Sequence, residues 1–264
     1  MRIRKLAIRF HWILSEQLGL DLLKFLRTCR GILPFTLDFI KFRRSYTGPI
    51  SIAPCFGDRF ANADADNSEY FWQDLIAARE IAEQKPVRHI DVGSRLDGFV
   101  AHVASFRHIE VFDIRPISAD IPGVTFIQAD MMSEQAVNSR TSLRGCCDSI
   151  SYLHALEHFG LGRYGDTVTP MGYHLGLKNI STLLQPGGIC YLSLPVGVQR
   201  VEFNANWVFT PENIIDKALS EGLIFKRLII IVPSGVLHDV SNEQAALKLN
   251  LQEDRLGLFI FRKT

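Results

Sequence analysis

The chain has 264 residues, of which 47% are apolar and 22% are charged. This length and composition suit one large domain or a domain with an extension, and they exclude a disordered chain, a collagen and a small disulfide scaffold. The formal net charge of +1 hides an asymmetry. Residues 1–46 contain ten basic and three acidic side chains, a net charge of +7, whereas residues 47–264 contain 19 and 25, a net charge of −6. We therefore expect a basic extension and an acidic body with separate roles.

The cysteines and the first residues bear on the cellular location. The cysteines are odd in number, two are adjacent and none forms a CxxC pair, which argues against a disulfide framework and a structural zinc site. The first segment is basic, but Arg9 and His11 interrupt its apolar stretch, so a secretory signal is not expected. No uncharged run reaches the length needed to cross a bilayer. We expect a cytoplasmic protein, either free or peripheral on the inner surface of the membrane.

Residues 1–48 are predicted to form a basic, amphipathic helical extension. Apolar side chains recur every three or four positions in residues 3–18, which predicts a helix with a basic opposite face. A second helix is expected over residues 21–29, and residues 35–46 are again apolar and basic. Glycines and prolines interrupt the segment that follows. The predicted second domain comprises residues 49–264.

The body alternates predicted helices with short apolar strands. Helices are expected at residues 68–83, 98–105, 174–184 and 211–221. Strands are expected at residues 87–92, 109–114, 124–128, 148–153, 189–194, 223–232 and 256–261. This alternation is typical of an α/β fold with a mostly parallel sheet. Because no convincing crossover helix joins the last two strands, we expect one of them to run antiparallel.

Glycines and acidic residues follow the first three predicted strands, where ligands bind in an open α/β sheet. Gly93 permits a tight turn, and the helix that follows offers free N–H groups. Asp113 lies 22 residues after Asp91, a spacing at which an acidic side chain can bind both hydroxyls of a ribose. Asp130 and Met131 follow the third strand and suit an adenine edge. The candidate nucleoside-binding residues are Asp91, Gly93, Ser94, Arg95, Gly98, Asp113, Ile114, Asp130 and Met131.

This pattern is similar to that of class I S-adenosylmethionine-dependent methyltransferases. The residues that carry the resemblance are Asp91, Gly93, Asp113, Asp130 and the turn Gln185-Pro186-Gly187-Gly188. The resemblance implies a Rossmann-like, seven-stranded sheet with an antiparallel last strand, and S-adenosylmethionine as the cofactor. The usual methyltransferase loop has its second glycine where this chain has Arg95, a residue that could either obstruct or clamp the methionine carboxylate. The sequence GSRLDG also differs from GxGxxG, which disfavours a nicotinamide-binding domain.

Longer segments point to a narrower family. They are EYFWQDL (69–75), HIDVGSRLDGFVAHVASF (89–106), VFDIRP (111–116), LHALEHFGLGRYGD (153–166) and RVEFNANWVF (200–209). Together they resemble an uncharacterised methyltransferase-like family, domain of unknown function 268, over roughly residues 50–264. The resemblance implies an enzyme of bacterial surface-polysaccharide biosynthesis that acts on a sugar, a nucleotide-sugar or a glycolipid precursor. It also implies a helix or lid over the cofactor at Tyr70, Phe71 and Asp74, although the spacing of these residues equally suits core packing.

The loop after the fourth strand carries the densest set of polar side chains in the body. Transfer of a methyl group to oxygen or nitrogen needs a general base with a pKa near neutrality, and histidine supplies this best. We predict His154 as the base, oriented by Glu157 or Asp166, with His158 as the other catalytic candidate. The candidates for acceptor binding are Arg163, Tyr164, His174, Asn204 and Asn206.

Two other interpretations of this loop stay open. His154 could pack against the adenosine while His158 caps a helix. Alternatively, the spacing His-x-x-Glu-His places His154 and His158 four residues apart, as in zinc-binding helices. The corresponding alternatives for the whole protein are a sugar-modifying enzyme of the same fold with a different, metal-dependent reaction, and a non-catalytic scaffold of a polysaccharide assembly complex.

The basic extension, residues 1–46, allows three interpretations. Its apolar and basic residues suit an anionic membrane surface that presents a lipid-linked sugar acceptor. They equally suit a partner protein or a second copy of the chain, and they suit packing on the acidic body. A nucleic acid partner is not expected, because the body is acidic and shows no basic–aromatic groove.

Overall fold

The computed structural model describes residues 10–60, 68–133, 143–249, 251 and 253–264. The chain divides into two compact units, Met1–Ala65 and Asp66–Thr264. Within the described ranges, no helix is both long enough and apolar enough to span a bilayer.

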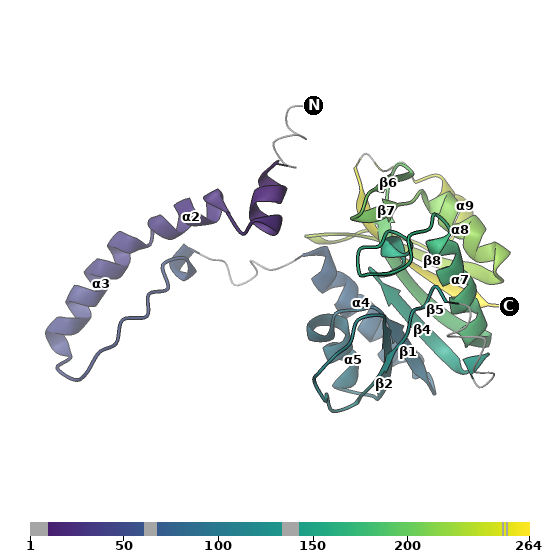
Figure 1. Cartoon of the computed structure of the whole chain (residues 1–264), viewed down its shortest axis with the longest axis horizontal. Helices are drawn as coiled ribbons and strands as arrows, with labels where there is room; N and C mark the ends of the chain where they lie inside the picture. The colour runs from purple at the N-terminus through teal and green to yellow at the C-terminus, as the bar shows by residue number, and fades with distance from the viewer. Residues whose placement is uncertain (1–9, 61–67, 134–142, 250, 252) are drawn as a thin grey trace. The chain divides into compact units, whose positions relative to one another are not determined.

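The N-terminal unit is helical (Figure 1). Asp21 begins its first long helix by accepting a hydrogen bond from the backbone N–H of Lys24 at 2.8 Å, which is the capping role that favours aspartate at this position. The predicted helix at residues 21–29 is confirmed. Of the helix predicted over residues 3–18, residues 3–9 lie outside the described residues. The elements are a π-helical turn (Ile13–Gln17), α2 (Leu22–Cys29), α3 (Ile32–Ser45) and a 3-10 turn (Asp58–Phe60).

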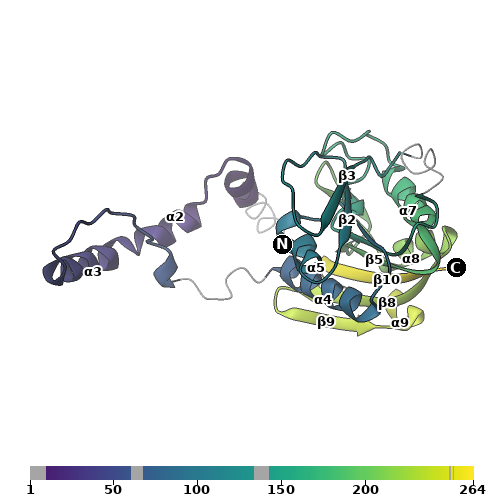
Figure 2. The same cartoon turned by 90° about the horizontal axis from the view of Figure 1, so that it is seen from below.

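The C-terminal unit contains an eight-stranded sheet in the order β3-β2-β1-β4-β5-β10-β8-β9 (Figure 2). Strands β3, β2, β1, β4 and β5 pair in parallel, and β10 runs antiparallel to both β5 and β8. The predicted mixed sheet with an antiparallel last strand is therefore confirmed. The strands are β1 (His89–Val92), β2 (Ile109–Asp113), β3 (Val124–Gln128), β4 (Cys147–Leu153), β5 (Leu184–Val196), β8 (Leu223–Val232), β9 (Gly235–Val240) and β10 (Arg255–Lys263).

The sheet has one strand more than predicted, and a small hairpin is inserted after β5. Strand β9 pairs antiparallel with β8 at the edge of the sheet. Its side chains lie mostly exposed, so the alternation of buried and exposed residues that would identify a strand is missing. The hairpin consists of β6 (Arg200–Glu202) and β7 (Asn206–Val208), which pair only with each other.

Helices cover both faces of the sheet and bury two apolar clusters (Figures 1 and 2). On one face Ile81 and Val103 pack with Ile229, and on the other Leu177 and Ile214 pack in the larger cluster. The helices of the first face are α4 (Glu69–Gln84), the π-helical turn η3 (Leu96–Val100) and α5 (Ala101–Ala104). Those of the second are α7 (Gly172–Leu183), α8 (Pro211–Ser220) and α9 (Glu243–Leu247).

The topology positions the site. The chain steps outward from β1 to β2 and β3, and it then returns to place β4 on the other side of β1. The order of strands reverses between β1 and β4, so the loops after these two strands diverge and leave a crevice at their carboxyl ends.

Candidate active site

A pocket opens at the carboxyl ends of β1, β2, β3 and β4. Its walls are largely apolar with a few polar groups, as in most small-molecule sites. Predicted site residues that line it are Gly93, Asp113, Ile114, Asp130, Met131, His154, His158, Tyr164 and Asp166. The lining residues that the sequence did not single out are Val92, Phe112, Arg115, Ala129, Met132, Ala155 and Phe159.

The glycine turn after β1 is held from below by a buried carboxylate. Gly93 has a positive φ of 74°, and a Cβ atom there would lie 2.9 Å from the Cβ of Ala155 in the loop after β4. Asp91 is fully buried and accepts hydrogen bonds from Ser94 Oγ at 2.7 Å, from the Ser94 backbone N–H at 3.1 Å and from Ser151 Oγ at 2.5 Å. Asp91 and Ser94, which we predicted as cofactor ligands, thus bind each other and shape the turn.

Burial raises the pKa of Asp91 to about 7, against the opposing effect of its hydrogen bonds from Ser151 and Ser94. Because folding raises this pKa, the native state favours the protonated form of Asp91. The stabilisation that the protonated side chain provides is therefore lost as the pH rises from about 4 through 7. Relative to Asp91→Asn, the wild-type free energy of unfolding should fall by up to about 4 kcal/mol across this interval. Urea unfolding of both proteins at a series of pH values measures the difference, in which groups common to both cancel. A difference that stays constant with pH would contradict the raised pKa.

The loop continues away from the pocket at Arg95. This side chain is largely exposed and forms an ion pair with Asp97, with a distance of 2.7 Å between Nη2 and Oδ2. It does not line the pocket in this structure, where its guanidinium is held by Asp97. Gly98 also lies outside the lining, and the lack of a Cβ at this position leaves room for Oδ2 of Asp74, which would lie 2.6 Å from such an atom.

Asp113 ends β2 at the pocket wall, and Arg115 holds it. Arg115 Nε donates to Oδ1 at 3.0 Å, Nη2 donates to Oδ2 at 2.6 Å, and the backbone N–H of Arg115 donates to Oδ1 at 2.8 Å. The Arg115 guanidinium also lies 4.7 Å from the ring centroid of Tyr164. A carboxylate oxygen can accept two hydrogen bonds, so Oδ2 keeps one acceptor position toward a ligand in this arrangement.

Asp130 organises the turn after β3. Its Oδ1 accepts a hydrogen bond from the backbone N–H of Met132 at 2.8 Å, which is the local bond typical of aspartate in turns. From α7, Asn179 Nδ2 donates to the carbonyl of Met131 at 2.8 Å. Met131 and Met132 are buried at the pocket, so this part of the wall presents backbone and thioether groups beside one carboxylate.

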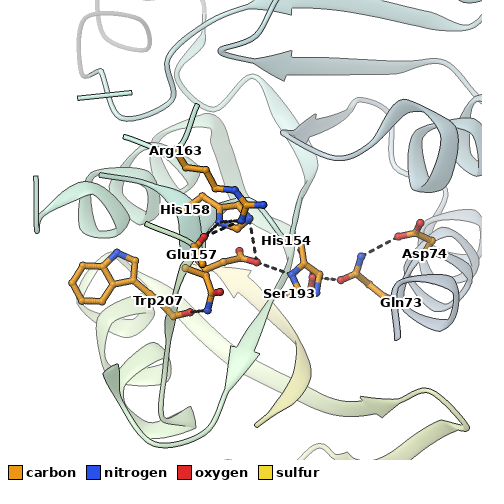
Figure 3. A network of polar contacts seen from close by, with 10 residues as sticks. Gln73, Asp74, His154, Glu157, His158, Arg163, Ser193 and Trp207 are labelled. Carbon is orange, nitrogen blue, oxygen red and sulfur yellow. Dashed lines mark hydrogen bonds and ion pairs between the residues drawn. The ribbon is translucent and has the colours of Figure 1, made fainter. Parts of the chain in front are cut away.

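A histidine–carboxylate pair follows β4 (Figure 3). His154 Nδ1 lies 2.6 Å from Oε1 of Glu157, which is fully buried on the 3-10 turn Leu156–His158. Burial alone would raise the pKa of Glu157, but the neighbouring His154 and, more weakly, His158 lower it below its ordinary value, so the carboxylate stays ionised. An ionised Glu157 can only accept a hydrogen bond, so Nδ1 carries the hydrogen and donates it to Oε1, and in the neutral imidazole the lone pair is then on Nε2.

Two atoms of this pair lack partners. His154 Nε2 and Glu157 Oε2 are both buried, and neither forms a hydrogen bond with any described residue. Buried polar atoms without partners are costly and uncommon, and His154, unlike Glu157, lines the pocket, so its Nε2 is the one of the two that we relate to a ligand. His154 also has a positive φ of 54°, a conformation that is uncommon in non-glycine residues and is enriched at functional sites.

Neighbouring elements fix the strained backbone of His154 (Figure 3). Its N–H donates to Ser193 Oγ on β5 at 3.2 Å, Ser193 Oγ donates to Gln73 Oε1 on α4, and Gln73 Nε2 donates to Asp74 Oδ1 at 2.9 Å. The ring of Tyr70 packs on His154 with 4.4 Å between ring centroids. Tyr70 therefore packs against the imidazole, and it does not line the pocket, so a lid over the cofactor at this position stays a prediction.

The remaining polar residues of the loop hold its shape. Asp166 does not orient His154, because its Oδ2 accepts the backbone N–H groups of Gly160 at 2.9 Å and Gly162 at 3.1 Å, and Glu157 takes the orienting role instead. His158 Nδ1 donates to the carbonyl of Ala205 at 2.7 Å, and burial lowers the pKa of His158.

The metal interpretation has no matching geometry in the described part of the chain. Residues 156–158 form a 3-10 turn, so the spacing of the two histidines does not act on one face of an α-helix. His154 Nδ1 and His158 Nδ1 face different partners, Glu157 and the Ala205 carbonyl. Among the described residues, no three His, Cys, Asp or Glu side chains are grouped so as to hold a metal ion.

Several predicted acceptor residues lie beside the pocket and do not line it. Arg163 Nη1 donates to the Ala205 carbonyl at 2.9 Å, and its guanidinium lies 5.3 Å from the ring centroid of Tyr164. His174 packs on Tyr173 in α7, with 4.2 Å between ring centroids. Asn204 is exposed in the turn of the β6–β7 hairpin, and Asn206 donates to the carbonyl of its neighbour Trp207.

Solved structures share this fold at low sequence identity. A 1,6-didemethyltoxoflavin-N1-methyltransferase from Burkholderia thailandensis, solved with its substrate and S-adenosylhomocysteine, is 13% identical with a TM-score of 0.51, and the match covers 91% of this chain and 89% of that chain. A methyltransferase-like protein from Thermobifida fusca, 14% identical, gives a TM-score of 0.51 over 74% of this chain and 80% of that one. The [4+2]-cyclase SpnF, 15% identical, gives 0.50 over 72% and 81%.

Sequence comparison identifies one family. A search of curated proteins gave no match. Residues 127–215 match the family described as Caenorhabditis protein of unknown function, DUF268. The match includes the loop after β4 and the β6–β7 hairpin, and it is shorter than the resemblance over residues 50–264. The chain therefore has the Rossmann-like fold of class I methyltransferases and, over residues 127–215, the sequence pattern of DUF268.

Proposed function

We propose that the C-terminal unit is a methyltransferase that binds S-adenosylmethionine in the pocket at the carboxyl ends of β1 to β4. One observation carries the proposal. On a methyltransferase fold, this pocket brings together a glycine turn, an acidic residue at the end of β2 and an imidazole with an unpartnered, buried Nε2. Each is a group that the reaction requires, for binding the nucleoside and for moving a proton.

The residues of the pocket divide between cofactor and acceptor. Asp113 would accept a hydrogen bond from a ribose hydroxyl through the free position of Oδ2, and Asp130 with Met131 would bind the adenine, while the turn at Gly93 lets the backbone approach the ligand closely. When bound, S-adenosylmethionine supplies an electrophilic methyl group. Asp91, Ser94 and Gly98 act indirectly, because their contacts shape the loop.

Proton removal is assigned to His154. Its Nε2 would take the proton from an acceptor hydroxyl or amine as that oxygen or nitrogen bonds to the methyl group and displaces S-adenosylhomocysteine, and Glu157 would hold Nδ1–H and stabilise the resulting imidazolium. Tyr70 excludes water by packing over the imidazole. The acceptor therefore needs an ionisable O–H or N–H group that can reach Nε2.

The acceptor is proposed to be a sugar, a nucleotide-sugar or a lipid-linked sugar precursor of surface polysaccharide. The aromatic ring of Tyr164 at the pocket, with Arg163 and Arg115 packed on it, supports such an acceptor, since aromatic rings and guanidinium groups suit sugar rings and phosphates. Among the described residues, Arg163 has no carboxylate partner. A lipid-linked acceptor would place the enzyme at the inner surface of the membrane.

A second candidate is a different reaction on the same fold. The match to the [4+2]-cyclase SpnF favours it, because that protein has this fold and its name describes ring formation. Fold alone does not decide between these reactions.

Isothermal titration of the purified chain with S-adenosylhomocysteine tests cofactor binding, with saturable one-site heat as the expected result. Incubation with radiolabelled S-adenosylmethionine and a small-molecule cell extract then tests methyl transfer. No heat in the titration would refute the proposal. Heat without any transfer of label would favour the second candidate.

A further inference from the structure

The helices of the N-terminal unit leave one apolar face uncovered. Leu22 and Leu26 in α2 are four residues apart, and Leu33, Leu37 and Ile40 in α3 follow at spacings of four and three, so each set lies on one side of its helix. These five side chains, here named the α2–α3 stripe, are between 45% and 67% exposed. No residue of α3 is buried.

The opposite side of α3 has a partner within the unit. Phe35 contacts Phe56 of the return segment, with 5.3 Å between ring centroids, and it stacks with Phe39 at 6.4 Å. An ion pair of 2.5 Å between Arg59 and Asp38 joins the same segment to the helix. The unit therefore packs through its phenylalanine side, and the α2–α3 stripe takes no part in that packing.

The surroundings of the stripe are basic. Arg30, Lys41, Arg43 and Arg44 are exposed in or beside the two helices, and none of them forms an ion pair with a described carboxylate. Residues 1–46 carry a net charge of +7. Two such extensions would repel each other, so charge disfavours a second copy as the group that covers the stripe.

We infer that the α2–α3 stripe docks on an anionic phospholipid surface. The leucines and isoleucine enter the boundary between headgroups and acyl chains, and the basic side chains meet the anionic headgroups. A helix that lies in this plane needs an apolar face with basic flanks, and α2 and α3 provide both. The inference goes beyond methyl transfer, because no residue of the pocket enters it.

Flotation of the full chain with vesicles tests the docking. The protein should float with vesicles of phosphatidylglycerol mixed equally with phosphatidylcholine, float poorly with pure phosphatidylcholine, and be released from the anionic vesicles at high ionic strength. The double variant Leu33→Asp/Leu37→Asp should reduce the partition coefficient at least about tenfold. The matched control Leu219→Asp/Leu237→Asp makes the same change at two exposed leucines of the C-terminal unit and should float like the wild type.

Light scattering of the same proteins measures their oligomeric state and so distinguishes lipid from the other two candidates for covering the stripe, a second copy and the body of the same chain. A monomeric wild type that floats, together with a monomeric stripe variant that does not, supports docking on lipid. A wild type that is dimeric and does not float, together with a stripe variant that is monomeric, would overturn the inference in favour of a second copy. A monomer that never floats would also overturn it, and it would favour packing of the extension on its own body. Neither result bears on S-adenosylhomocysteine binding, which the titration measures separately.

Discussion

Asp113→Ala is expected to weaken the binding of S-adenosylhomocysteine at least about tenfold, because one hydrogen bond to a charged carboxylate contributes about 1.5–3 kcal/mol. The carboxylate lies at the pocket wall at the end of β2, and its Oδ2 keeps an acceptor position toward a ligand. Isothermal titration measures the affinity. If the alanine variant folds poorly, Asp113→Asn provides the test in its place, because it keeps the shape of the side chain. Its loss of affinity should be smaller than the loss expected for Asp113→Ala.

Two further variants separate ligand binding from a structural role of Asp113. Arg115→Met removes the guanidinium that holds both carboxylate oxygens, so it should leave S-adenosylhomocysteine binding equal to or stronger than that of the wild type. Asp97→Ala removes an exposed carboxylate that is likewise paired with an arginine, and it should bind normally. If Arg115→Met lost affinity as Asp113→Ala does, the ion pair itself would be what the site requires, and the ribose assignment would be wrong.

His154→Ala is expected to lower kcat for methyl transfer by about 10²–10⁴, the usual contribution of a general base, with little change in S-adenosylhomocysteine affinity. The reason is the position of Nε2, which is buried, unpartnered and oriented by Glu157 through Nδ1. The rate of methyl transfer is measured as the transfer of label from radiolabelled S-adenosylmethionine to the fraction of the cell extract that contains the acceptor. Glu157→Gln should cause a smaller loss, since glutamine can accept the Nδ1 hydrogen bond but carries no charge to stabilise the imidazolium.

The matched control for this prediction is His108→Ala. His108 is exposed beside the amino end of β2, where it contacts Thr125, and its removal should not change the rate. Full activity of His154→Ala would remove the proposed base. A loss of S-adenosylhomocysteine binding that parallels the loss of rate would instead indicate that His154 packs against the nucleoside.

Residue type and order along the chain predicted the fold and nine of the sixteen residues of the pocket wall, because strand ends can be recognised from apolar runs that stop at glycine or aspartate. They did not predict which way each side chain faces. An aspartate at a strand end looks the same in sequence whether it meets a ligand, as proposed for Asp113, or lies buried beneath a turn, as Asp91 does.

Side-chain partners were the hardest feature to predict. Arg115 closes on Asp113 across the bend that follows β2, where its backbone N–H also donates to Oδ1, a local bond that aspartate makes in many turns and that the sequence alone does not single out. Asp166 binds the N–H groups of its own loop, and this depends on the positive φ angles of Gly160 and Gly162. Strand β9 escaped prediction because its exposed side chains carry no alternating pattern.

The central position of β10 has a consequence for how the protein is made. This strand lies between β5 and β8 in the sheet, yet it follows both in the sequence. During synthesis the two parts of the sheet therefore cannot join until residues 255–263 have left the ribosome. Until then the facing edges of β5 and β8 have no strand between them, and side chains such as Leu192 and Ile230, fully buried in the folded protein, lie near an open seam. The middle of the sheet is thus completed only after β10 has been synthesised.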